Sequence, residues 1–288
     1  MFRTTLIAAT LSIAFAGAHA AQPLHVKVYN ADGNSFNVNS TLVYGEKEAM
    51  VIDAGFTRAD ALRIAANVLD SGKELKTIYV SQADPDYYFG VETIKEIFPK
   101  AEVVTTPAVL AKINAKLAGK IAFWGPKMGA NAPRTPVLPK AISGTTLTVD
   151  GQTVEIRGAT GALGHRPYAW IPSIKAVVGN IGVFGTNMHV WTADTQTVAE
   201  RSAWVAQLDE MAALQPAMVV PGHMPAGTAL DVTNVTYTKG YLQAFEKNAA
   251  AAKNSAELID AMKKAYPAAP MGLSLDIGAK VSKGEMKW

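Results

Sequence analysis

The sequence predicts an α/β fold in which two β-sheets are packed between layers of helices. Two observations support this prediction. Short strand-like runs alternate with helical segments, and a β-rich half of this kind is followed by a second one. No linker divides the two halves, so we expect one domain over residues 21–288.

The N-terminus resembles a cleavable secretory signal over residues 1–20. Arg3 precedes an apolar run from Leu6 to Ala16, and Ala18-His19-Ala20 offers a cleavage site. The apolar run is about half as long as a membrane-spanning helix, so we do not expect a membrane anchor. The mature protein is therefore expected in the periplasm or outside the cell.

The composition is that of a globular domain, with 49% hydrophobic and 18% charged residues. The chain contains no cysteine, which excludes disulfides and thiolate ligands or nucleophiles. The formal charge is only +3 and the basic residues are scattered, so we expect no nucleic-acid partner.

The first half predicts strands, each followed by a turn or a helix. The expected strands are Leu24–Tyr29, Ser40–Tyr44, Ala49–Ile52, Thr77–Val80 and Glu102–Thr105. The expected helices are Thr57–Leu69, with Thr57 and Asp60 forming the cap, Val91–Phe98 and Pro107–Leu117. The segment from Gly119 to Lys140 is rich in Gly and Pro, which predicts a long loop beside a cleft or an insertion packed on the surface.

The second half opens with a hairpin signature, since two β-rich runs flank Asp150-Gly151. The expected strands are Thr145–Val149, Thr153–Ile156, Tyr168–Ile171, Ala176–Val178 and Met218–Val220. The expected helices are Val198–Leu214, Tyr237–Ala252 and Ala256–Ala265, the last with Asn254 and Glu257 as a capping box.

Four landmarks give the chain a specific resemblance to a known family. They are Asp53-Ala54-Gly55 after a strand, the loop Ser81–Gly90, Gly179-Asn180 after a strand, and Pro221-Gly222-His223. In this order, across nearly the whole mature chain, they resemble the metallo-β-lactamase superfamily. The resemblance implies a four-layer αβ/βα sandwich.

The loop Ser81–Gly90 departs from that family's metal-binding motif. Family enzymes carry His-x-His-x-Asp-His, whose side chains converge on one or two zinc ions. The aligned residues here are Gln82, Asp84, Asp86 and Tyr87, so three of the four ligand types have changed. A tyrosine ligand would need a deprotonated phenol, which its usual pKa near 10 disfavours. A dinuclear zinc site is therefore not expected.

The remaining landmarks leave a reduced set of ligands. Gly158–Ala162 occupies the place of the family's Gly-His-Thr-Pro-Gly-like turn, with His165 a few residues later as a reserve ligand or a plain loop histidine. Asn180 replaces a bridging aspartate, and His223 is kept. The resemblance thus implies at most one divalent metal ion, held by Asp84, Asp86, Asn180 and His223. Alternatively, Asp84 and Asp86 cap the helix near Val91 or fix the loop by hydrogen bonds to its amides, and His223 is only hydrogen-bonded in its turn.

Two functions follow from these residues. In the first, the chain is a hydrolase of an ester, lactone, thioester or amide, in which Asp86 and His223 act in catalysis beside the metal. In the second, it is a metal-free binding or scaffold protein on the same fold. The expected ligand is a small molecule, and its contacts are Gln82, Tyr87, Tyr88, Phe123, Trp124 and His189, with Trp191 and Asp194 near the same cleft or in packing roles. Asp53 is expected to support the loop structurally.

Overall fold

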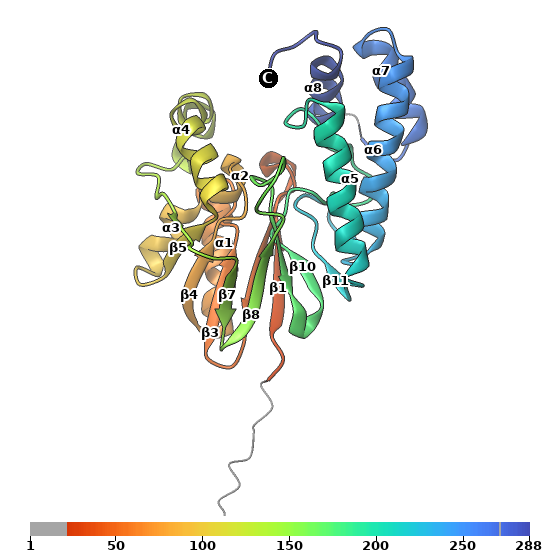
Figure 1. Cartoon of the computed structure of the whole chain (residues 1–288). Helices are drawn as coiled ribbons and strands as arrows, with labels where there is room; N and C mark the ends of the chain where they lie inside the picture. The colour runs from red at the N-terminus through yellow and green to blue at the C-terminus, as the bar shows by residue number, and fades with distance from the viewer. Residues whose placement is uncertain (1–21, 271) are drawn as a thin grey trace, which may run out of the picture.

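Two sheets lie face to face between two layers of helices in the computed structural model, which describes residues 22–270 and 272–288 (Figure 1). This arrangement is the predicted four-layer αβ/βα sandwich. The expected signal sequence lies outside the described residues.

The first sheet has six strands in sequence order. They are β1 (His25–Asn30), β2 (Asn39–Tyr44), β3 (Glu48–Ile52), β4 (Glu74–Tyr79), β5 (Glu102–Thr105) and β6 (Lys140–Ala141). The pairs β1–β2 and β2–β3 are antiparallel, whereas β3 to β6 run parallel. The carboxyl ends of β3 and β4 therefore meet at one edge, where the loop Ser81–Gly90 begins.

The second sheet has five strands in the order β11-β10-β9-β8-β7. They are β7 (Thr146–Val149), β8 (Gln152–Arg157), β9 (Tyr168–Ile171), β10 (Ala176–Val178) and β11 (Met218–Val219). All neighbours are antiparallel except β10 and β11, which are parallel. The predicted hairpin is confirmed, and both Asp150 and Gly151 in its turn have positive φ, as that turn type requires.

Helices cover the outer face of each sheet. On the first sheet lie α1 (Arg58–Ser71), α2 (Pro85–Tyr88), α3 (Val91–Ile97) and α4 (Pro107–Met128). On the second lie α5 (Val198–Ala213), α6 (Thr233–Ala251), α7 (Ser255–Ala265) and α8 (Leu273–Ser282). Short 3-10 turns occur at η1 (Gly33–Ser35), η2 (Gly129–Asn131) and η3 (Pro172–Ile174). The short α2 and the final α8 were not predicted from the sequence.

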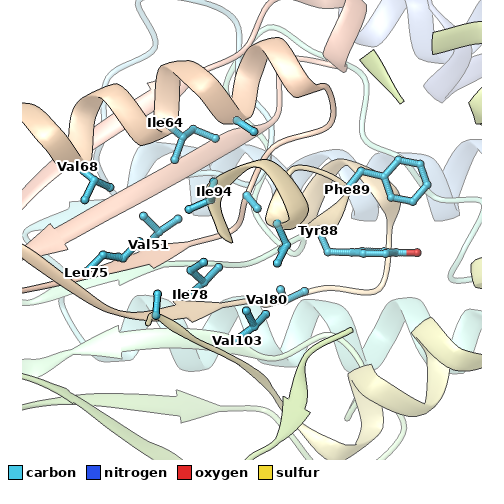
Figure 2. Close-up of a cluster of buried hydrophobic side chains, with 14 of the residues drawn as sticks. Val51, Ile64, Val68, Leu75, Ile78, Val80, Tyr88, Phe89, Ile94 and Val103 are labelled. Carbon is cyan, nitrogen blue, oxygen red and sulfur yellow. The ribbon is translucent and has the colours of Figure 1, made fainter. Parts of the chain in front are cut away.

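Buried side chains fill the space between the layers. Figure 2 shows the cluster under α1 and α3, in which Val51 and Ile78 of the sheet meet Ile64 and Ile94 of the helices. A separate cluster lies between the sheets and includes Met50. Each such side chain stabilises the fold by about 1.5–3 kcal/mol on full burial.

Two predicted helix caps can be checked directly. Thr57 and Asp60 form the complete capping box expected at the start of α1. At α7, the Asn254 side chain accepts a hydrogen bond from the Glu257 amide, but the Glu257 carboxylate accepts from Lys253 instead. In this second box, the Glu257 carboxylate therefore accepts from the amide one residue before the cap residue Asn254.

The prediction of a loop from Gly119 to Lys140 is wrong over its first part, because α4 continues to Met128. Leu117, Ile121, Trp124 and Met128 recur at helical spacing and pack against the cluster beneath them. This packing outweighs the low helix propensity of the glycines and Pro126. Only residues 132–139 are irregular.

Among the described residues, no helix combines the length and the apolar character that crossing a membrane requires.

Candidate functional site

Asp53 joins the ends of two neighbouring strands. It follows β3 with φ 66°, and its carboxylate accepts hydrogen bonds from the backbone amide and the hydroxyl of Ser81, both at 2.7 Å. Burial raises the pKa of Asp53 to about 8, against the opposing effect of these two bonds. Both carboxylate oxygens are thus occupied in fixing the start of the loop.

The loop folds into α2, which begins at Pro85 and buries Asp86, Tyr87 and Tyr88. Asp84 makes no capping hydrogen bond and instead lies 3.5 Å from the Lys120 amino group on α4. No side chain caps α3 either, since Gly90 stands at that position. The hypothesis that Asp84 and Asp86 cap the helix at Val91 is therefore wrong.

His223 lies at the centre of a closed set of contacts and is 8% exposed. Its Nδ1 atom lies 2.9 Å from the Phe36 carbonyl, and its Nε2 atom lies 3.2 Å from the Tyr87 hydroxyl. The same Nε2 lies 3.5 Å from the Asp86 carboxyl. The ring stacks on Phe184 at 5.4 Å. Protein groups thus contact both ring nitrogens of the imidazole.

These contacts and the burial of the cluster determine which atoms of His223 and Asp86 carry a proton. Because the Phe36 carbonyl only accepts, Nδ1 of His223 donates to it, and Nε2 of the neutral ring is an acceptor. Burial lowers the pKa of His223 to about 4. Burial, together with the Asp84 charge, raises the pKa of Asp86 to about 8. Burial therefore favours the neutral form of the ring and the protonated form of Asp86.

Asn180 uses its side chain to hold the backbone. Its Nδ2 donates to the Val220 carbonyl at 2.9 Å, and its Oδ1 accepts from the Val183 amide at 2.8 Å. The Asn180 backbone carbonyl accepts from the Tyr87 hydroxyl at 3.2 Å. These bonds occupy both ends of the amide that was predicted to be a metal ligand.

Gln82 is similarly engaged. It is 1% exposed, and its Nε2 donates to the Pro167 carbonyl at 2.9 Å. Its amide nitrogen thus points into the second half of the chain and links the two halves.

The donor set does not fit the metal centre that the fold suggests. Among the described residues, no group of three or more His, Cys, Asp or Glu side chains lies close enough to hold an ion. The predicted ligands Asp86 and His223 do lie together, but Asp84 is paired with Lys120 and the Asn180 amide is used elsewhere. No chemical step through a metal is derived for this arrangement.

A small polar pocket with a volume of about 30 Å³ lies beside this cluster. Its lining comes from both halves of the chain and comprises Gln82, Ala83, Asp84, Lys112, Lys116, His165, Arg166, Ile181 and Asp194. A wider hollow of about 310 Å³ lies at the opposite end of β3, among turns that include Glu48 and Asp150. Only the first pocket adjoins the loop.

The pocket lining includes a second segment that fits one of the landmarks. Gly164-His165-Arg166-Pro167 stands directly before β9, which ends at Ile171 just before Pro172, and this pattern also resembles the Gly-His-Thr-Pro-Gly-like turn. The predicted place, Gly158–Ala162, lies earlier in the same connection, directly after β8. The presence of Pro167 and the strand behind it was the available sequence signal.

Five predicted ligand contacts, Tyr87, Tyr88, Phe123, Trp124 and His189, lie outside the pocket lining. Phe123 is exposed on α4. Tyr88 and Trp124 pack with the aromatic rings under α4, and His189 is 3% exposed and contacts the Tyr241 hydroxyl at 3.0 Å. Gln82 does line the pocket, whereas the buried Tyr87 lies in the adjacent cluster.

Asp194, which the sequence placed near the cleft, lines the pocket. Indole nitrogens hold its carboxylate, Trp191 at 2.6 Å and Trp288 at 2.9 Å. Burial alone would raise the pKa of Asp194, but Arg166 and the two indoles outweigh it and lower the pKa.

Sequence reasoning missed the cations of this pocket. Arg166 stands beside His165, and Lys112 and Lys116 project from α4 one turn apart. With Lys120, the lysines recur every four residues, which places them on one face of a helix. That periodicity was the signal, and it lay partly in the segment predicted as a loop.

Comparison with known proteins agrees with the fold. The family model described as the Metallo-beta-lactamase superfamily matches residues 33–175. The chain belongs to the metallo-β-lactamase superfamily. Members of this superfamily commonly bind divalent metal ions, and the fold is hydrolase-like. No curated protein matches the sequence significantly.

Solved structures of this superfamily resemble the chain over most of its length. A metallo-β-lactamase family protein from Thermus thermophilus has a TM-score of 0.62 at 16% identity, covering 91% of this chain and 93% of its own. A β-lactamase domain protein from Burkholderia ambifaria has a TM-score of 0.62 at 12% identity, covering 90% and 84%. A metallo-β-lactamase from Pontibacter korlensis has a TM-score of 0.52 at 17% identity, covering 78% and 97%. At these identities the likeness shows the fold alone.

Proposed function

We propose that this superfamily member is an exported, metal-independent binding protein for a small molecule. The observation that carries the proposal is the closed cluster of Asp86, Tyr87 and His223, in which protein groups occupy the atoms that would face a metal ion. The signal-like N-terminus supports export.

The cluster favours binding over metal catalysis for a chemical reason. A zinc or other divalent ion needs deprotonated donors with free lone pairs. Here burial and the Asp84 charge raise the pKa of Asp86, which favours its protonated form, and the Tyr87 hydroxyl lies against the one imidazole nitrogen that could coordinate. Burial also raises the pKa of Tyr87 well above 10, so a phenolate ligand is disfavoured. The polar pocket beside the cluster is the place where a ligand would bind.

A mononuclear hydrolase is the second candidate. The 3.5 Å approach of Asp86 and His223 favours it, because two donors of the right type remain adjacent. Binding an ion there would require Tyr87 to move and Asp86 to lose its proton. Its substrate would be an ester, lactone, thioester or amide.

Metal analysis of the purified mature protein separates the two candidates. After incubation with Zn²⁺, Mn²⁺ or Mg²⁺ and gel filtration, we expect far less than one ion per chain and no hydrolysis of p-nitrophenyl acetate above that of a His223→Ala variant. A stoichiometric ion that is lost in Asp86→Ala or His223→Ala would support the hydrolase and overturn the proposal.

A further inference from the structure

We propose that the pocket beside α2 binds an oxyanion, a carboxylate or phosphate group on a small molecule, through Arg166 together with Lys112 and Lys116. This proposal names the class of ligand for the proposed binding function. It rests on the proposed function in one respect, that the ligand is bound and released without reacting.

Arg166 is a buried cation with few partners. It is 4% exposed and lines the pocket, and its NH2 group makes one long hydrogen bond, 3.4 Å, to the Ile181 carbonyl. Its Nε atom has no hydrogen-bond partner among the described residues. The guanidinium lies over the Trp204 ring at 4.6 Å. A guanidinium has five N–H donors, and buried charges are normally paired and hydrogen-bonded.

Arg201 shows how this same fold satisfies a buried arginine. It is also 4% exposed, but its guanidinium contacts the Glu246 carboxylate and donates to the Thr195 carbonyl at 2.7 Å. For Arg166, no carboxylate of the described chain lies within 4.0 Å. The contrast indicates that the guanidinium of Arg166 is arranged for a partner from outside the chain.

The two carboxylates of the pocket are already engaged. Asp194 accepts hydrogen bonds from two indoles, and Asp84 lies against the Lys120 amino group. They moderate the positive charge of the pocket without pairing directly with Arg166.

Two lysines extend the positive charge to the surface. Lys112 and Lys116 line the pocket from α4 and are exposed to solvent. Burial lowers the pKa of His165 to about 4, and the positive charges of Lys112 and Arg166 contribute to this decrease. Exposed lysines around a concave site attract anions and raise their local concentration.

The size of the pocket limits what enters it. A pocket volume of about 30 Å³ is enough for a single oxyanion group and too small for a whole metabolite. The remainder of the ligand would lie outside, along Lys112 and Lys116. A forked guanidinium suits a carboxylate or phosphate in this position.

The test is calorimetric titration of the full mature protein, in chelator, with sodium acetate, succinate and inorganic phosphate as separate probes at low ionic strength. We expect saturable one-site binding of at least one probe and a matching rise in Tm. The probe that binds more tightly identifies the group as a carboxylate or a phosphate. If none of the probes binds saturably at millimolar concentration, the proposal is overturned.

Variants assign the site. Arg166→Gln should weaken binding by at least about tenfold, since charge-assisted hydrogen bonds are lost. Its Tm without ligand is measured alongside, because the substitution also removes the attraction between Arg166 and Asp194. Lys112→Gln and Lys116→Gln should each weaken binding less, and Lys127→Gln, an exposed lysine farther along α4, should leave it unchanged.

Equal binding in Arg166→Gln and wild type would overturn the assignment, as would an equal loss in Lys127→Gln. The failure of the proposed function is distinguishable, because metal content and ester hydrolysis are measured without the anion. Anion binding that persists in chelator supports the pocket whatever the metal analysis gives.

Discussion

The Nε2 atom of His223 lies 3.2 Å from the hydroxyl oxygen of Tyr87, although 136 residues separate the two in sequence. The hydroxyl lies equally close to the Asn180 carbonyl, so one phenolic proton serves two buried acceptors. This contact joins the loop after β4 to the turn after β11. It also places an oxygen of the protein where a metal ion would need an open coordination position.

Removing that hydroxyl should weaken the fold. Tyr87→Phe leaves the Asn180 carbonyl and His223 Nε2 short of a donor in a buried site. We expect the free energy of unfolding to fall by about 1–3 kcal/mol, as measured by urea denaturation.

The neighbouring tyrosine supplies a matched control. Tyr88 is 2% exposed, and its hydroxyl is buried with no hydrogen-bond partner among the described residues. Tyr88→Phe should therefore be neutral or slightly stabilising. Equal losses in the two variants would show that the Tyr87 hydroxyl has no special role.

The Asp86 carboxyl should make stability depend on pH. Its pKa is raised to about 8, whereas an unfolded aspartate titrates near pH 4. The folded chain keeps a proton that the unfolded chain releases, so this contribution is complete below about pH 4 and is lost as the pH rises through about 8. His223 acts in the opposite sense: its contribution is complete above about pH 6.5 and is lost as the pH falls to about 4.

Asp86→Asn isolates the first effect, because asparagine does not titrate. Relative to wild type, the variant should gain about 2 kcal/mol of stability between pH 6 and pH 8.5. Urea denaturation at pH 6, 7 and 8.5 measures the gain. Parallel stability profiles for the two proteins would contradict the raised pKa of Asp86.

Restoring the family's histidines should restore metal binding. The triple variant Gln82→His, Asp84→His, Tyr87→His recreates His-x-His-x-Asp-His with Asp86 and leaves His223 in place. We expect zinc to raise its unfolding free energy by about 3 kcal/mol at one hundred times the dissociation constant, and to leave wild type unchanged. Thermal denaturation with and without zinc measures this difference.

The same triple variant with His223→Ala is the control, and it should bind zinc more weakly. If the restored loop remains indifferent to zinc, then the backbone, and not the side chains, prevents metal binding.

Gly222 has no room for a side chain. A Cβ atom there would lie 2.2 Å from the Asn180 carbonyl oxygen and 2.6 Å from the Tyr87 hydroxyl. Gly222→Ala should therefore lower the unfolding free energy by about 1–3 kcal/mol or more and disturb the His223 cluster. Gly33→Ala, where a Cβ meets nothing within 4 Å, is the control. Similar stabilities of both variants would contradict the tight contact.

Gly119 tests the correction to α4. It lies within the helix, and an added Cβ would meet nothing within 4 Å. Gly119→Ala should stabilise the protein by about 0.5–1 kcal/mol, because alanine loses less conformational freedom in a helix. Circular dichroism during thermal denaturation measures the change. A loss of stability would argue against a helix at this position.

Local chemistry in the sequence was sufficient for much of the fold. The strands Ser40–Tyr44 and Ala49–Ile52, the Asp150-Gly151 hairpin and the Thr57 cap were all confirmed, because alternation, turn residues and capping depend on near neighbours. Helix α4 was shortened in the prediction because glycine and proline are weak helix formers, and only packing against the core reverses that preference.

The candidate site divides in the same way. The sequence alone determined which residues stand in the loop Ser81–Gly90, and hence that its histidines are replaced. Only the tertiary structure decided that Tyr87 contacts His223, that the Asn180 amide is used by the backbone, and that Arg166 is buried beside two lysines without a carboxylate partner among the described residues. Burial and pairing across distant segments set protonation and charge in a site, and no short stretch of sequence contains both partners.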